Sequence, residues 1–421
     1  MKSIIFIFYF IVIFINSKEL NNAQEKLLFV FQQFRHGARQ PYRSFDDKNW
    51  KDIFKESWKG NGELTPIGMR MHYLLGINTK MKYNEFLKGY NPNDILIRST
   101  DVNRTILSGF STLQGLFNNS DNHILNENQI TKGIILNKNY SESISHKIKN
   151  LGNKAVEGGF GFYPNHIFPT NYNHQYNIFR RSDCPGIVKY LNEIKNSDEI
   201  KKLTFEISEK INNTYGEYIF KFMNKSGVEE PLYLYNYDNL FDIADTFITD
   251  YFNGRELKYI NNTGINMEEF YNECLNISFV ESYYRTFGIS PTKLLYLSIS
   301  PVFHSLFNYM DKRIEVDKNP REKINLSDSP KFVLTAGHDN SLGLNDLFLK
   351  HELNLNFGRA EYSQSQVYEL WKNESDDKYY IKYLVNQKIK AKYLYEEFKL
   401  KVKSKLYSQE TINEICNSSE K

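Results

Sequence analysis

The sequence predicts an α/β protein with a doubly wound, mostly parallel sheet and a smaller, mainly α-helical domain inserted into it. Three short apolar runs end abruptly in polar residues, and a capped helical segment follows each of the first two. At 421 residues the chain is too long for one ordinary core. We therefore expect a signal peptide at residues 1–17, an α/β domain formed by 18–184 and 298–421, and a helical cap at 185–297.

The N-terminal segment has the order of a secretory signal peptide. A basic start is followed by the apolar run Ser3 to Ile15 and then by Asn16-Ser17. A membrane anchor is the alternative, but the run is shorter than the roughly 20 apolar residues that a spanning helix needs. We expect a mature chain without a stable membrane span, either secreted or held in the lumen of a lysosome or digestive vacuole.

Charge and cysteine content narrow the class of protein further. Lys and Arg number 53 against 50 Asp and Glu, a net charge of +3, and the basic residues are scattered, so nucleic acid is not an expected partner. Three cysteines suit an oxidising compartment if two of them pair, and sequence alone leaves three choices of pair. N-glycosylation sequons are abundant, which suits a glycoprotein.

The three expected sheet strands are short and rich in apolar or β-branched residues. They are Leu27 to Phe34, Asp94 to Thr100 and Lys331 to Asp339. Two later segments, 363–373 and 378–386, flank the turn-like sequence 374–377 and predict an antiparallel hairpin at the sheet edge.

Two helices are expected after the first two strands. Thr65 and Pro66 predict the start of one helix, whose apolar residues Ile67, Met71, Leu74 and Leu75 recur at helical spacing. Asp101 predicts the N-cap of the next. The segment from about 185 to 297 is long, charged and helix-rich in pattern, with few strand signals.

Each expected strand ends in residues suited to an anion site. Because ligands bind outside the carboxyl ends of strands in open α/β sheets, three separate segments direct polar groups towards one crevice. The first strand supplies Arg35, His36 and Arg39, the second Arg98, and the third His338 and Asp339. Singly, each of these residues is more often structural. Together they predict a phosphate site.

The chemistry follows from the residue types. Planar, permanently charged guanidinium groups match phosphate oxygens, and their charge lowers the pKa of a histidine set among them. His36 then keeps a nitrogen lone pair in acid and attacks phosphorus, while Asp339 protonates the leaving ester oxygen. His338 hydrogen-bonds a phosphate oxygen. The scheme needs no metal and no cofactor, and we find no convincing metal-ligand spacing among the histidines.

The motifs that carry these residues resemble the histidine acid phosphatases, a branch of the phosphoglycerate-mutase-like superfamily. The resemblance covers residues 34–41 (FRHGARQP), 63–69 (ELTPIGM), 97–105 (IRSTDVNRT) and 336–339 (AGHD), and more loosely 369–371. It implies a phosphoglycerate-mutase-like α/β domain with a helical cap and hydrolysis of phosphate monoesters in acid. It also implies that His36 is the nucleophile, that Asp339 is the proton donor, and that phosphate is bound by Arg35, Arg39, Arg98 and His338.

The same resemblance bears on the cysteines. Cys184 and Cys416 resemble one disulfide of the family, so we predict that pair and leave Cys274 free. Animal relatives usually carry six cysteines, so other disulfides of the family are missing here.

Three alternative functions are weighed against the acid phosphatase. A phytase-like or lysophospholipid-phosphate preference uses the same chemistry. A phosphotransferase or mutase that passes the phosphoryl group to a sugar acid is a second alternative, and the secretory start argues against it. A catalytically dead binding protein is the third, although it would be expected to lack His36 or Asp339, and both are present. The expected partner is a small phosphate monoester, and the sequence permits a homodimer.

Overall fold

The structure is a computed structural model. It describes residues 25–42, 60–117, 124–133, 142–167, 184–223, 232–254, 265–320, 329–356 and 358–417. The expected signal peptide lies outside these ranges. Within them, no helix is both long and apolar enough to cross a membrane.

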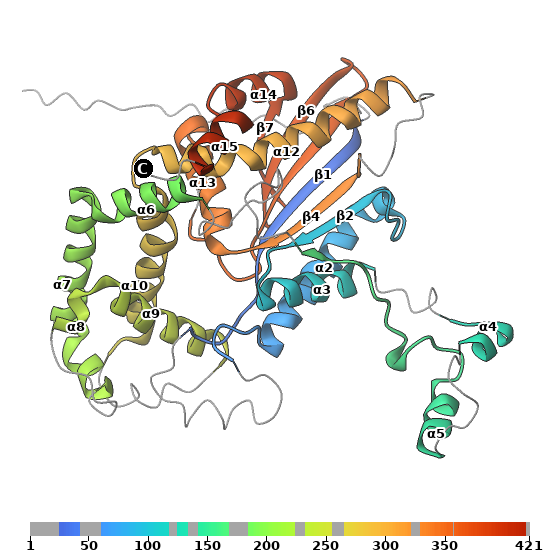
Figure 1. The fold of residues 1–421 in the computed structure, drawn as a ribbon, viewed down its shortest axis with the longest axis horizontal. Helices are drawn as coiled ribbons and strands as arrows, with labels where there is room; N and C mark the ends of the chain where they lie inside the picture. The colour runs from blue at the N-terminus through green and yellow to red at the C-terminus, as the bar shows by residue number, and fades with distance from the viewer. Residues whose placement is uncertain are drawn as a thin grey trace, which may run out of the picture.

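A mixed sheet forms the centre of the molecule (Figure 1). Among the described residues it has seven strands, in the order β3-β2-β4-β1-β5-β6-β7. The strands β3, β2, β4 and β1 are parallel to one another, whereas β5, β6 and β7 run antiparallel to their neighbours. Their bounds are β1 Glu25–Arg35, β2 Ile95–Ser99, β3 His166–Ile167, β4 Phe332–Gly337, β5 Ser365–Asn373, β6 Lys378–Val385 and β7 Lys388–Leu394.

The strand predictions are confirmed, and two strands that were not predicted, β3 and β7, are added at the two edges of the sheet. The three apolar runs form β1, β2 and β4, and the expected hairpin forms β5 and β6. This hairpin is not the edge of the sheet, however, because β7 pairs with β6 beyond it. Lysines at positions 388, 390 and 392 interrupt the apolar pattern that would have predicted this strand. Lysine is common on exposed edge strands, where its charge opposes pairing with another chain.

Helices cover both faces of the sheet. Alternate residues of β1 point to opposite faces, so Phe29 and Phe31 pack in one core cluster while Val30 and Phe34 pack in another. The first cluster lies under α12 (Lys293–Lys318), α13 (Asp339–Leu353) and α14 (Tyr395–Lys403). The second lies under α2 (Pro66–Leu87) and α3 (Asn103–Leu116). This doubly covered sheet is the predicted α/β architecture.

Helices α2 and α3 pack through small residues, which the apolar pattern did not predict. A Cβ at Gly76 would lie 2.1 Å from the carbonyl oxygen of Thr112, and a Cβ at Gly115 would lie 2.0 Å from that of Tyr73. The two backbones therefore touch. As a result, Ile67 and Leu74 are exposed, and the buried face of α2 carries glycine, threonine and His72 instead.

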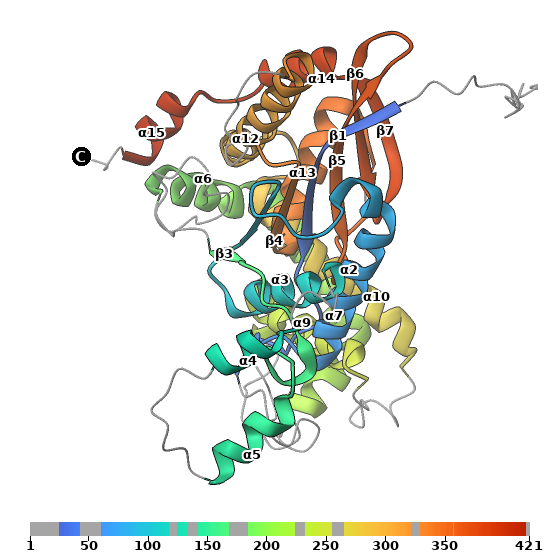
Figure 2. The ribbon, with the colours of Figure 1, turned by 90° about the vertical axis from the view of Figure 1, so that its right-hand side faces the viewer.

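A body of helices forms a second core beside the sheet, below and to the left of it in Figure 1 and in yellow and green in Figure 2. Its apolar centre draws mainly on α7, α9 and α10, with Ala38 and Tyr362 added from the α/β part. Its helices are α6 Pro185–Asn196, α7 Asp198–Met223, α8 Leu232–Tyr235, α9 Tyr237–Phe252, α10 Met267–Phe279 and α11 Arg285–Phe287, with a π-helical turn at Val280–Tyr284 before α11. The domain boundaries remain predictions, and α12 runs continuously across the expected boundary at 297.

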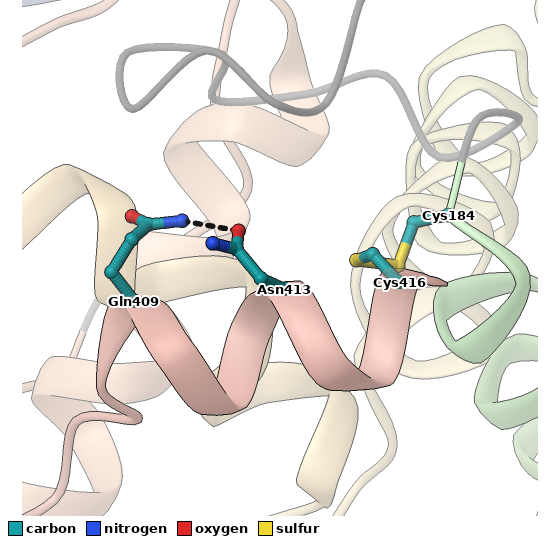
Figure 3. Close-up of a disulfide and its surroundings, with 4 residues drawn as sticks. All are labelled: Cys184, Gln409, Asn413 and Cys416. Atoms are coloured by element: carbon teal, nitrogen blue, oxygen red, sulfur yellow. Dashed lines mark hydrogen bonds between the residues drawn. A yellow bond between two sulfur atoms is a disulfide. The ribbon is translucent and has the colours of Figure 1, made fainter. Parts of the chain in front are cut away.

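The Cys184–Cys416 disulfide is present, with a Cα–Cα distance of 4.4 Å. It joins the start of α6 to the last turn of α15 (Gln409–Asn417), and Figure 3 shows the bond at the end of α15. Because it links residues 232 positions apart, it removes much chain entropy from the unfolded state. Cys274 is buried and free.

The small helices α4 (Glu127–Lys132) and α5 (Glu142–Leu151) extend away from the sheet (Figure 1).

Candidate active site

The site lies where the two central parallel strands end. The adjacent strands β1 and β4 pair Arg35 with Gly337, and the N–H of His36 donates to the carbonyl oxygen of Gly337 at 2.9 Å. The next helix in the chain after β1, α2, lies on one face of the sheet, and α13, which follows β4, lies on the other. Ligands bind at such a switch point in open α/β sheets.

His36 is 2% exposed and held in one ring orientation. Its Nδ1 lies 2.9 Å from the carbonyl oxygen of Gly37. A carbonyl only accepts, so Nδ1 carries the proton and Nε2 keeps its lone pair. The loop that holds this ring needs glycine, because a Cβ at Gly37 would lie 2.5 Å from the carbonyl oxygen of Gly68 at the start of α2.

The arginines around His36 are Arg35, Arg39 and Arg104. Burial is the largest cause that lowers the pKa of His36, and the charges of Arg104, Arg35, His338 and Arg39 lower it further. The Nε–H groups of these three arginines are buried and find no acceptor in the described part of the chain. An unpaired buried donor costs about 1–3 kcal/mol, so donors gathered at one place indicate a site for an anion.

Arg104, rather than Arg98, is the third arginine of this group. Arg98 lies one residue before the end of β2, on the same face as Leu96, which packs against the core under α12. Arg104 is in the first turn of α3, and its Nη2 lies 3.4 Å from Nδ1 of His338. The role of Arg98 as a phosphate ligand stays a prediction without support from this geometry.

The cause of this difference is the start of α3. The helix begins at Asn103, with Val102 rather than Asp101 at the N-cap, so the expected cap residue is wrong. A residue in the first turn of a helix that follows a strand reaches the carboxyl edge of the sheet. A residue inside the strand points to one face instead. Arg104 stands in the same IRSTDVNRT motif as Arg98. A correct prediction of where α3 begins would have placed it in the first turn of the helix and therefore at the site.

His338 follows β4 and faces His36. The two ring centroids are 5.6 Å apart, and Nε2 of His338 lies 3.0 Å from Oγ1 of Thr100. Burial, and then the charge of Arg104, lowers the pKa of His338 to about 3, although Asp339 opposes the shift. His338 is therefore neutral, with both a donor and an acceptor nitrogen beside the site.

Asp339 is the first residue of α13 and pairs with Arg35, with Oδ2 3.2 Å from Nη2. Its side chain keeps 22% exposure, so it also meets solvent. Burial raises its pKa, but the charges of Arg35 and then Arg359 outweigh burial and hold the pKa below its ordinary value. In the free site Asp339 is thus a carboxylate.

Two residues that the sequence did not single out complete the arginine cluster. Asp245 on α9 accepts two hydrogen bonds from Arg39, at 2.6 and 3.0 Å. The ring of Tyr42 lies against Arg39, 4.0 Å from Cζ to the ring centroid, and its hydroxyl accepts from Nη2 of Arg104 at 2.6 Å. The pairing of Arg39 with α9 depends on tertiary structure, and no motif in the sequence announces it.

Another buried histidine, His72, lies against β1, with its ring centroid 4.7 Å from that of Phe34. His72 is buried, with Nδ1 3.0 Å from Oγ1 of Thr112. In the described ranges, no group of three or more His, Cys, Asp or Glu side chains is suited to hold a metal ion. The absence of a metal from the reaction remains a prediction.

The chain is similar to known phosphatases in sequence. Residues 25–149 match the model of the histidine phosphatase superfamily, branch 2. The lysosomal acid phosphatase of Xenopus laevis is 25% identical over 387 residues, which is 91% of this chain and 74% of that protein. The prostatic acid phosphatase of Homo sapiens is 43% identical over 96 residues, which cover 22% of this chain and 24% of the relative.

The fold agrees with a solved structure as well. The phytase from Citrobacter braakii superposes with a TM-score of 0.53 and 14% identity, covering 91% of this chain and 98% of that one. The mixed sheet and its helices thus have the architecture expected from the resemblance. Residues 25–149 thus match branch 2 of the histidine phosphatase superfamily, and the relatives that the chain resembles are acid phosphatases, which supports phosphatase activity for this chain.

Proposed function

We propose that this phosphatase hydrolyses phosphate monoesters in acid through a phosphohistidine on His36. The observation that carries the proposal is the ring of His36. Its Nδ1 is held by the carbonyl of Gly37, its Nε2 is free to attack, and three arginines beside it have buried, unpaired Nε–H donors in the described structure. Such donors stabilise the charge on a transferring phosphoryl group.

The first half-reaction forms a bond between Nε2 of His36 and phosphorus and breaks the bond from phosphorus to the ester oxygen. Asp339 supplies the proton that this oxygen takes, and the alcohol leaves. Although Asp339 is a carboxylate in the free site, the negative charge of a bound phosphate offsets the arginines that lower its pKa. Substrate binding therefore favours the protonated form that the step requires.

In the second half-reaction a water molecule attacks phosphorus and the bond to Nε2 of His36 breaks. The carboxylate of Asp339 takes the proton from the water, so inorganic phosphate leaves and the acid is regenerated. His338 and Arg104 contact each other at this edge and would bind phosphate oxygens in both steps. The lowered pKa of His36 keeps its lone pair available where the carboxylic acid still donates.

For the location, we propose the lumen of a lysosome or a secreted form. The support is the expected signal peptide at residues 1–17, the Cys184–Cys416 disulfide, and the name of the lysosomal relative. The sequons at described positions such as Asn276 are consistent with a glycoprotein, since that side chain is exposed.

The test is phosphate release from p-nitrophenyl phosphate across the acid range, by wild type and by His36→Ala. We expect activity near about pH 5 and a loss of about 10³-fold or more in the variant, since its nucleophile is gone. Full activity in the variant would refute the mechanism. Thermal unfolding of both proteins controls for folding.

A further inference from the structure

Arg359 is another buried arginine at the edge of the active site, and the reaction described above does not use it. It lies in the segment between α13 and β5, and its side chain is 8% exposed. Nη2 donates to Oγ of Ser278 on α10 at 3.1 Å. Its Nε and Nη1 are buried and have no hydrogen-bond partner among the described residues.

The backbone next to Arg359 places it beside the active site, because the carbonyl oxygen of Ala360 accepts a hydrogen bond from Nη1 of Arg35 at 2.7 Å. After Arg35, Arg359 is the charge that most lowers the pKa of Asp339, the group that meets the leaving oxygen. Its charge also acts on Tyr362, whose ring lies 4.2 Å from Cζ of Arg35. Arg359 therefore lies between the proton donor and the cap helix α10.

The charge of Arg359 is poorly compensated. Two carboxylates act on it: Glu361, whose Oε2 is 4.0 Å from Nη1 and whose side chain is 46% exposed, and Asp339, which already pairs with Arg35. Burial, and then repulsion from Arg35, lowers the pKa of Arg359, although an arginine stays charged at any physiological pH. A buried cation with unpaired donors beside a reacting centre is the arrangement expected of an anion-binding group.

We infer that Arg359 forms an anion subsite for a second phosphate group, carried by the alcohol part of the substrate. This inference rests on the proposed function. The substrates that it favours are bisphosphates whose second phosphate lies a few atoms from the scissile ester. A second phosphate bound there also offsets the charge of Arg359 on Asp339, which aids protonation of that carboxylate in the enzyme that is about to react.

The experiment measures kcat/KM for the bisphosphates of linear diols, from ethanediol to hexanediol, and for the matching monophosphates. Phosphate release is measured at about pH 5 with wild type, Arg359→Met and Arg359→Lys. We expect wild type to prefer the bisphosphate of the best length by about 10- to 100-fold, the effect of one charged hydrogen-bonding group. Arg359→Met loses this preference, and Arg359→Lys keeps part of it.

Glu361→Gln is the matched control, because it removes the competing carboxylate and keeps Arg359. Its preference for bisphosphates should equal or exceed that of wild type. The inference is overturned if wild type shows no preference, if Arg359→Met retains it, or if Glu361→Gln weakens it. If the enzyme hydrolyses the monophosphates but shows no preference for the bisphosphates, the subsite is refuted and the proposed function stands. If no substrate releases phosphate, the proposed function itself is refuted.

Discussion

Two buried polar clusters lie along helix α13, and they differ in charge and in hydrogen bonding. The active-site cluster, at the start of α13, consists of Arg35, His36, Arg39, Arg104, His338 and Asp339. The interior cluster, one to two turns further along, consists of Tyr283, Asn345, Asp346, Gln366, Tyr368 and Tyr383. The first is dominated by positive charge, whereas the second has a single acidic side chain, Asp346, whose pKa is raised well above its ordinary value by burial among neutral groups.

Hydrogen bonding separates the two clusters clearly. In the interior cluster, Gln366 donates to Asp346 at 2.7 Å, Tyr283 donates to it at 3.2 Å, and Tyr368 donates to Asn345 at 2.6 Å. Within the described chain, none of its side-chain polar atoms is buried without a partner. In the active-site cluster three arginine donors are unpaired. A satisfied network stabilises the fold, whereas an unsatisfied one costs stability and is retained for binding.

The largest change in activity is expected from substitution of one of the two arginines of the IRSTDVNRT motif. Arg104→Leu should lower kcat/KM for p-nitrophenyl phosphate by about 10²- to 10³-fold, because it removes a donor to the transferring group. Arg98→Leu is the matched control and should cost less than about tenfold. Steady-state kinetics measures both. Equal losses, or a larger loss for Arg98→Leu, would contradict the placement of Arg104 in the site.

The stability of the same Arg104→Leu variant tests whether the active-site cluster lowers the free energy of unfolding. Burial and the charge of Arg39 lower the pKa of Arg104, so its cation is destabilised in the folded protein. Urea unfolding should show a variant that is as stable as wild type or more stable. A clear loss of stability would mean that the active-site cluster supports the fold.

The interior cluster should respond in the opposite way. Asp346→Ala leaves the donors of Tyr283 and Gln366 without their acceptor, at about 1–3 kcal/mol for each group. We expect a lower urea midpoint with an unchanged slope, and a fall of less than about tenfold in kcat/KM of the folded variant. A stable variant that has lost its activity would reverse the roles of the two clusters.

A smaller, pH-dependent effect is expected at His72, which is buried behind the active-site loop. Burial lowers the pKa of His72 to about 3, and hydrogen bonding to the backbone opposes this by less. Because the folded pKa lies below the unfolded value of about 6.5, the unfolded state binds the proton first, and stability falls as the pH falls below about 6.5.

His72→Gln should remove this dependence. Wild type should lose about 2 kcal/mol more than the variant between about pH 6.5 and 5, at 1.4 kcal/mol for each pH unit. Urea unfolding at the two pH values measures the difference. If the two proteins lose stability in parallel, His72 does not stay neutral in the folded state.

The strands and the resemblance to histidine phosphatases could be predicted from the sequence, whereas the third arginine was missed because the start of α3 was misplaced. The apolar runs of β1, β2 and β4 are unambiguous, and the polar residues that end β1 and β4 form the site as expected. Arg98 stands at the end of an apolar run, which predicts a side chain at the carboxyl end of the strand. The strand continues to Ser99, and the alternation of side chains turns Arg98 to one face.

Two further features were hidden because they arise from tertiary contacts. The buried face of α2 depends on Gly76 meeting Gly115, and glycine carries no apolar signal. The pairing of Arg39 with Asp245 joins residues 206 positions apart, and Asp245 lies among several acidic residues on a helix. Neither contact leaves a local pattern in the sequence.

The central claim is that Nε2 of His36 becomes covalently bonded to phosphorus. Wild type and His36→Ala are mixed with p-nitrophenyl phosphate at about pH 5 and quenched in base within the first turnovers, because phosphohistidine is labile in acid. Peptide mass spectrometry then locates any added phosphoryl group. The account predicts phosphorylation of His36 in wild type and none at this position in the variant. Product release by wild type with no phosphorylated His36, or with the phosphoryl group on another residue, would contradict it.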